Sequence, residues 1–113
     1  MLSADEFAIL DLAVEDSFGF WEIASVIQQR QADLSTAGAI DLAKNTVRRL
    51  LEMGFVSVCY QDDVGVEELP VSGDDASAAI VDGSNWEWPV GYQRMYRVLA
   101  TDEGRHAYYS SGS

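Results

Sequence analysis

The sequence predicts a single α+β domain built around one hydrophobic core. Three observations support this class: the chain has 113 residues, 48% of them are hydrophobic, and segments with helical spacing alternate with short segments rich in β-branched and aromatic residues. This length suffices for one domain and is too short for two separate cores. The hydrophobic fraction excludes an acidic disordered chain, although the formal net charge is −12. We expect residues 1–109 to form the domain and residues 110–113 to be a disordered tail.

The first predicted element is a helix over residues 3–16. Ser3 and Glu6 have the spacing of a capping box, in which each side chain accepts a backbone N–H from the other residue. Apolar residues form two stripes along this helix, which is more than one core contact needs. Either later elements cover both stripes, or the second stripe contacts another subunit in a homodimer. The residues of the second stripe are Ile9, Leu12 and Ala13.

The next predicted elements are a turn, two helices and a strand. Residues 18–21 predict a turn, and apolar residues at helical spacing predict a helix over residues 20–31. Ser35 or Thr36 can cap a longer helix that runs to residue 53, and Gly54 stands where a helix favours a left-handed residue. Residues 55–60 are β-branched and aromatic and predict a strand.

An unusually acidic segment follows, over residues 61–93, with eight acidic residues and no basic residue. Ser72 can cap a short helix over residues 73–81 that presents Ala76, Ala79 and Ile80 to the body of the domain. Large aromatic residues after this helix predict a structured insertion, because such side chains usually pack. A strand over residues 92–99 then returns antiparallel to the first strand, and Thr101 caps a last helix over residues 102–109.

This order of elements resembles a winged helix-turn-helix domain: three helices, a two- or three-stranded antiparallel wing carrying an inserted short helix, and a C-terminal helix. Residues 46–56 (Thr-Val-Arg-Arg-Leu-Leu-Glu-Met-Gly-Phe-Val) resemble a recognition helix entering the first wing strand. Residues 98–105 (Val-Leu-Ala-Thr-Asp-Glu-Gly-Arg) resemble the entry to the last helix of such domains. The resemblance implies DNA binding, whereas the acidic wing lacks the basic residues that would reach a phosphate backbone.

Two functions remain open at this point. In the favoured one, the acidic wing and its tryptophans bind a protein partner, and a basic partner would match the charge of the wing. Complementary charge raises association rate and specificity, and aromatic residues supply anchors. The candidate residues are Asp62, Asp63, Glu67, Glu68, Asp74, Asp75, Trp86 and Trp88. Alternatively, the acidic residues serve only to keep the protein dispersed in solution and bind no partner.

The second function is a DNA-binding transcriptional regulator that contacts DNA with the third helix and acts as a dimer. Its candidate residues are Lys44, Asn45, Arg48 and Arg49, of which three are basic in a chain with only seven basic residues. Asn and Arg suit adenine and guanine edges. On a helical wheel, however, Asp41 and Glu52 lie beside these cations and would form a solvated, salt-bridged face. The negative charge of the remaining chain also opposes approach to phosphates, so nucleic acid is the less favoured partner.

No motif predicts catalysis, a cofactor or a metal site. The one histidine, His106, and the one cysteine, Cys59, lie far apart in the sequence and complete no catalytic arrangement with a nearby nucleophile. The acidic pairs lack the spacing of a dedicated calcium loop. Neither a membrane span nor a signal peptide is apparent, so we expect a non-catalytic cytoplasmic protein that does not bind membranes.

Overall fold

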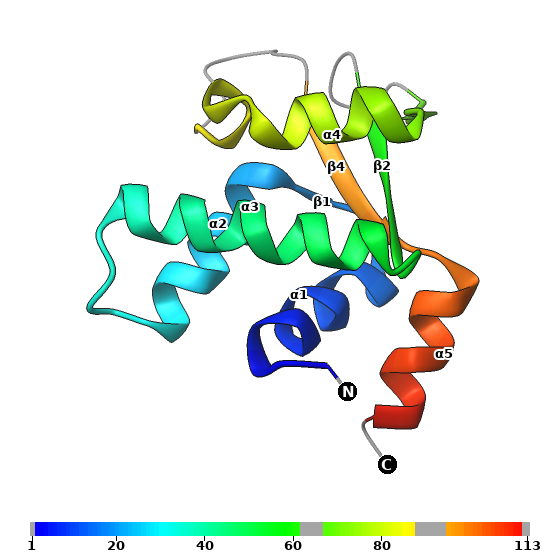
Figure 1. Cartoon of the computed structure of the whole chain (residues 1–113), viewed down its shortest axis with the longest axis horizontal. Coiled ribbons are helices and arrows are strands. Elements are labelled where there is room, and N and C mark those ends of the chain that lie inside the picture. Colours follow the sequence, from blue (N-terminus) through cyan, green and yellow to red (C-terminus); the bar gives the residue numbers. More distant parts are fainter. Residues whose placement is uncertain (1, 62–66, 88–94, 112–113) are drawn as a thin grey trace.

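The computed structural model describes residues 2–61, 67–87 and 95–111 (Figure 1). This part of the chain is α+β and contains five α-helices, one short 3-10 helix and a four-stranded antiparallel sheet. In chain order the elements are α1 (Ala4–Glu15), β1 (Phe18–Gly19), α2 (Phe20–Arg30), α3 (Thr36–Glu52), β2 (Val56–Gln61), β3 (Leu69–Pro70), α4 (Gly73–Val81), η1 (Gly83–Trp86), β4 (Met95–Ala100) and α5 (Asp102–Ser111).

Serine side chains begin three of the helices, as their spacing predicts. Ser3 accepts the Glu6 amide at 3.1 Å and Glu6 accepts the Ser3 amide at 2.8 Å, which confirms the capping box. Ser35 and Ser72 cap α3 and α4 in the same way. At the other end of α3, Gly54 has a φ of 77°, the left-handed conformation that ends a helix at little cost only for glycine.

The sheet has the strand order β1-β4-β2-β3, and all its pairs are antiparallel. β2 and β4 pair over six residues, from Val56 opposite Ala100 to Gln61 opposite Met95, as the two predicted strands require. Two short strands were not predicted. β1 forms where a turn was expected and pairs with β4, while β3 lies in the acidic segment and pairs with β2.

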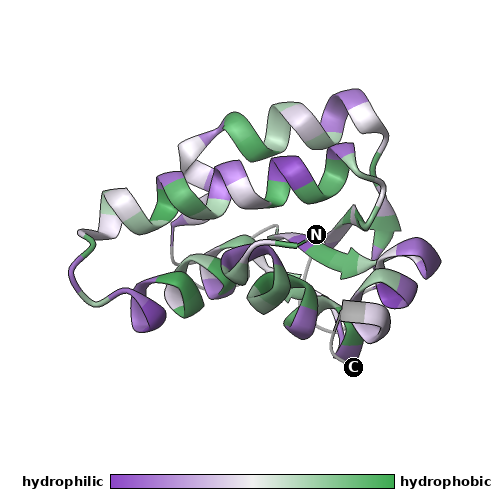
Figure 2. Cartoon of the chain, turned by 60° about the horizontal axis from the view of Figure 1, so that its bottom comes forward, coloured by the Kyte–Doolittle hydropathy of each residue, from purple (hydrophilic) through white to green (hydrophobic). Residues whose placement is uncertain are grey.

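The helices lie in layers, with α3 between α1 on one side and α4 on the other (Figure 1). Each helix carries both apolar and polar residues (Figure 2). The apolar faces form one core, whose largest fully buried side chains include Trp86, Phe20, Ile27, Leu50 and Val98. One core therefore joins all three layers.

The chain itself covers both apolar stripes of α1. Ile9 and Ala13 are 0% and 2% exposed, so neither side chain is available to a second subunit, and Leu12 is half-buried. On the other stripe, Tyr108 of α5 stacks on Phe7 with ring centroids 4.9 Å apart. The homodimer contact that the sequence suggested is thus replaced by core packing at Ile9 and Ala13.

The C-terminal helix extends further than its sequence suggests. α5 continues to Ser111, so Ser110 and Ser111 are helical rather than part of a disordered tail, while residues 112–113 lie outside the described part of the chain. The Arg105 guanidinium donates to the Val14 carbonyl oxygen at 2.5 Å, which ties α5 to the C-terminal end of α1. Among the described helices, none is long and apolar enough to cross a membrane.

Candidate functional site

The helix of the acidic segment forms as predicted and packs on the body of the domain. α4 covers the predicted residues 73–81, and Ala76, Ala79 and Ile80 are buried at 1%, 5% and 1% exposure. This buried face packs α4 against the body of the domain, and α4 contacts α3, where the Lys44 ammonium donates to the Val81 carbonyl oxygen at 3.4 Å. The lysine therefore stabilises the negative C-terminal end of α4.

Trp86 holds α4 and η1 against the body of the domain. It is 2% exposed, stacks on Phe20 with ring centroids 4.5 Å apart, and its indole N–H donates to the Ile80 carbonyl oxygen at 2.9 Å. The expectation that large aromatic residues after α4 pack on the domain is confirmed at Trp86, which clamps α4 and η1 onto α2. Because it is buried, this side chain is not available as an anchor for a partner. Trp88 lies outside the described residues.

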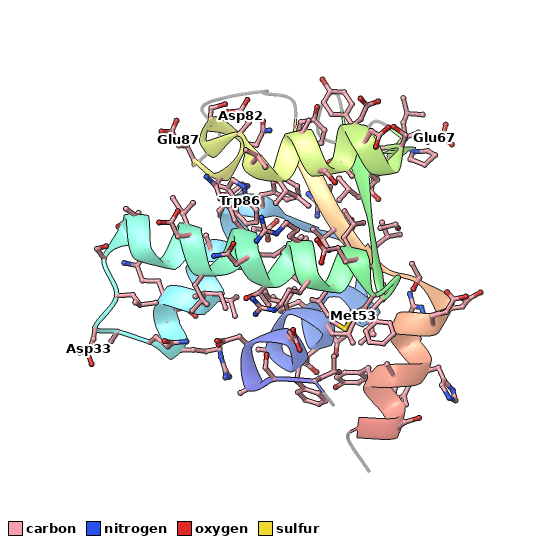
Figure 3. All side chains as sticks on the ribbon, in the orientation of Figure 1. Asp33, Met53, Glu67, Asp82, Trp86 and Glu87 are labelled. Atoms are coloured by element: carbon pink, nitrogen blue, oxygen red, sulfur yellow. The ribbon has the colours of Figure 1, made fainter. Side chains whose placement is uncertain are left out.

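Five exposed carboxylates lie on α4 or in the segments that flank it, and we call them the acidic surface. Figure 3 shows Glu67, Asp82 and Glu87 directed away from the body of the molecule. The acidic surface consists of Glu67, Asp74, Asp75, Asp82 and Glu87, all of which are exposed. The remaining candidates of this charge, Asp62 and Asp63, lie outside the described residues.

Glu68 differs from its acidic neighbours because it turns toward the sheet. One carboxylate oxygen accepts from the Ser17 hydroxyl at 2.5 Å and lies 3.3 Å from the Arg97 guanidinium, while the other accepts from the Cys59 thiol at 3.4 Å. Arg97 also donates to the Ser17 carbonyl oxygen at 2.7 Å. Glu68 therefore joins β3 to the rest of the sheet, and its predicted role at a partner surface is replaced by a structural one.

Burial and the neighbouring Glu68 carboxylate raise the pKa of the Cys59 thiol to about 12. The thiol is thus protonated and a poor nucleophile at neutral pH. On the acidic surface, by contrast, the Ser84 hydroxyl and amide lower the pKa of the Asp82 carboxyl, so this group stays ionised there.

The candidate DNA-reading residues of α3 are only partly available. Lys44 contacts α4 as described above, and the Arg49 guanidinium donates to the Glu6 carboxylate of α1 at 2.9 Å. Arg48 is exposed and donates to the Asn45 amide oxygen at 3.2 Å. The structure thus brings Asn45 and Arg48 together on the surface and directs the other two cations to neighbouring helices.

A hollow of about 740 Å³ lies beside the acidic surface, between α4 and the edge of the sheet. Asp75, Ala78 and Asp82 line it from α4, and Tyr60 and Tyr96 line it from β2 and β4. The two tyrosine rings are 5.2 Å apart between centroids. We call this hollow the tyrosine groove; no sequence signal identifies it, because its walls come from elements far apart in the chain.

Two other features of the described chain bear on chemistry. A second hollow of about 510 Å³ lies between α2 and α3 and is lined mostly by small and apolar side chains, including Ala24, Ala39 and Ile40. Within residues 2–61, 67–87 and 95–111, no group of three or more His, Cys, Asp and Glu side chains is arranged to hold a metal ion. His106 is exposed on α5.

Comparison with protein-family models, curated proteins and solved structures found no match for this chain.

Proposed function

We propose that this chain is a non-catalytic, regulatory interaction module of winged-helix type whose acidic surface binds a basic partner protein. The winged-helix part of the proposal is supported by the order of three helices, a strand, an excursion with a helix, a returning strand and a final helix. It is also supported by the pairing of β2 with β4, which forms the antiparallel base of such a wing.

The observation that carries the binding proposal is that, within the described residues, the ion pairs of the fold leave out the acidic surface. No described cation forms an ion pair with any of its five carboxylates. The guanidiniums of Arg49 and Arg97 instead pair with Glu6, Glu22 and Glu68. Lys44 offsets part of the charge at Asp82, and among the described residues the rest is left for solvent, dissolved ions or a partner to balance.

Electrostatics gives such a surface a definite effect on association. A concentrated negative field steers a positively charged protein toward the surface and raises the association rate, and dissolved salt screens this field over about 8 to 10 Å. Like charges at the same time disfavour acidic partners. The acidic surface therefore selects for a basic partner.

The proposal is tested by affinity purification from cells with two variants of equal charge. In the surface variant, all five carboxylates are changed to amides: Glu67→Gln, Asp74→Asn, Asp75→Asn, Asp82→Asn and Glu87→Gln. In the control variant, five exposed carboxylates elsewhere are changed: Glu15→Gln, Asp33→Asn, Asp41→Asn, Glu52→Gln and Glu103→Gln. Both variants shift the net charge by the same amount, and their melting temperatures show whether each remains folded.

A partner that binds the native chain and the control variant, is lost with the surface variant and elutes with added salt supports the proposal. A purified copy of that partner must then bind directly. Equal partner lists for both variants contradict it, because the acidic surface would then act only as a solubilising face.

The nucleic-acid alternative has support from one place, the exposed Asn45 and Arg48 on α3. Asp41 and Glu52 are exposed on the same helix and offset the charge of Arg48. Titration with mixed-sequence duplex DNA at low salt tests this alternative. Binding that has a steep salt dependence and is lost on Arg48→Glu would favour DNA over a protein partner.

A further inference from the structure

We propose that the tyrosine groove receives an extended arginine-containing segment of the basic partner, with arginines three positions apart. This inference rests on the proposed function and adds a place and a sequence pattern to it. The groove has one wall of small residues with a carboxylate at each end and an opposite wall with two aromatic rings. Each feature matches a different part of such a segment.

The spacing of the two carboxylates sets the spacing of the cations. Asp75 lies in the first turn of α4 and Asp82 is its C-cap residue seven positions later, and both line the groove; this separation corresponds to about two turns and about 10 Å along the axis. A polyproline II segment rises about 3.1 Å per residue with three residues per turn, so its positions i and i+3 face the same side about 9 Å apart. Two arginines at these positions therefore reach both carboxylates.

Both carboxylates can accept further hydrogen bonds. Asp75 uses its Oδ2 atom to accept from the Ser72 hydroxyl at 3.1 Å, and Asp82 uses its Oδ1 atom to accept from the Ser84 hydroxyl at 2.8 Å. No described residue donates to the second oxygen of either group. A guanidinium has a planar set of donors that suits such an oxygen better than an ammonium does.

The tyrosine wall favours the same ligand. Tyr96 stacks on Phe20 with centroids 5.9 Å apart, and Phe20 stacks on the buried Trp86, so the wall is held by packed rings. Tyrosine faces attract guanidinium groups and also pack against proline rings in extended segments. Opposite them, Ala78 leaves room for the backbone of the segment to approach α4.

Fluorescence polarisation with labelled synthetic peptides tests the inference. The matching peptide contains Arg-Pro-Pro-Arg between glycines, a second peptide contains Arg-Pro-Arg-Pro, and a third replaces both arginines of the first by lysine. All three carry the same side-chain charge. We expect the first peptide to bind most tightly, with the spacing variant weaker by about fivefold, the factor that one surface ion pair contributes.

Single variants locate the binding. Asp75→Asn and Asp82→Asn should each lower the affinity for the matching peptide by about fivefold. Asp74→Asn should change this affinity by less than about twofold. Asp74 is the matched control, because it is an exposed neighbour with the same charge but does not line the groove. Tyr60→Leu should weaken the matching peptide while keeping an apolar wall.

The results separate this inference from the proposed function. If Asp74→Asn weakens binding as much as Asp75→Asn, or if all three peptides bind equally, the groove is not the recognition site, although the acidic surface still binds cations. If the matching peptide does not bind while the whole partner is lost with the surface variant, the groove inference is overturned and the proposed function stands. If the peptide binds in the groove but affinity purification captures no partner, the results support the groove as a binding site and not the proposed function.

Discussion

Replacing Arg49 by alanine separates two roles that the sequence allows for this side chain. In the DNA interpretation Arg49 contacts a nucleic acid, so its loss leaves the fold intact. In the structure its guanidinium donates to the Glu6 carboxylate at 2.9 Å and joins α3 to α1. Arg49→Ala is therefore expected to lower the free energy of unfolding, and Arg48→Ala is the matched control on the same helix.

The size of the effect follows from the exposure of the two partners. The Arg49 side chain is 45% exposed and the Glu6 side chain 10% exposed, so the pair is neither fully buried nor a free surface pair. Hydrogen bonds to charged groups contribute about 1.5 to 3 kcal/mol, and exposed ion pairs about 0 to 1 kcal/mol. Because the Ser3 amide still binds Glu6 in the variant, we expect a loss of about 1 to 2 kcal/mol. For a chain of this size that corresponds to about 4 to 8 °C in melting temperature.

Urea unfolding followed by circular dichroism at several pH values measures the effect. Burial acts to raise the pKa of the Glu6 carboxyl, but the Ser3 hydrogen bonds and the Arg49 charge outweigh it and hold the pKa below its ordinary value of 4.5. A carboxyl with a lowered pKa stabilises the fold above its unfolded pKa, and this contribution disappears as the pH falls through the folded pKa. The difference between the native chain and Arg49→Ala should therefore be full at pH 7 and shrink below about pH 4.

Arg48→Ala should change stability by less than about 0.5 kcal/mol, because this side chain is exposed and contacts only Asn45 on its own helix. Equal effects of the two substitutions would refute the reasoning. So would an Arg49→Ala effect that persists unchanged at low pH, since the loss would then arise from packing and not from the ion pair.

Two further predictions concern packing and reactivity. A Cβ atom at Gly104 would lie 1.9 Å from the Phe55 carbonyl oxygen. Gly104→Ala should therefore lower the free energy of unfolding, measured in urea, by about 3 kcal/mol. Gly73→Ala is the control: its Cβ atom would meet no atom within 4 Å, so this change should be neutral or slightly stabilising. With a pKa of about 12, the Cys59 thiol should react with iodoacetamide at pH 8 on the order of 1,000-fold more slowly in the native chain than in denaturant. Comparable rates would show that the thiol is not held as described.

The elements that could be predicted from the sequence are those fixed by neighbouring residues. Ser3, Ser35 and Ser72 each cap a helix by accepting an amide three positions further on, so a short window contains both partners. The buried face of α4 follows from helical periodicity in the same way. The antiparallel pairing of β2 with β4 also follows, because the chain reverses direction between these two strands.

The features that could not be predicted depend on contacts between distant parts of the chain. Glu68 and Ser17 are 51 positions apart, and Arg97 and Ser17 are 80 positions apart. Nothing in an acidic run distinguishes Glu68, which points inward, from Glu67, which points outward. The two stripes of α1 were ambiguous for a similar reason, since the residues of α5 that cover one of them lie at the far end of the sequence.

The positions of the described arginines explain why the acidic surface lacks ion pairs within the described residues. Arg97 joins β4 to β1 and β3, Arg49 joins α3 to α1, and Arg105 joins α5 to α1. Each of these side chains connects elements within the body of the fold, and none reaches the carboxylates on the outer side of α4. Among the described cations only Lys44 lies near the acidic surface, where its charge acts on Asp82. Under the proposed function, the protein that binds the acidic surface supplies the positive charge, and we expect its association rate to fall as salt is added.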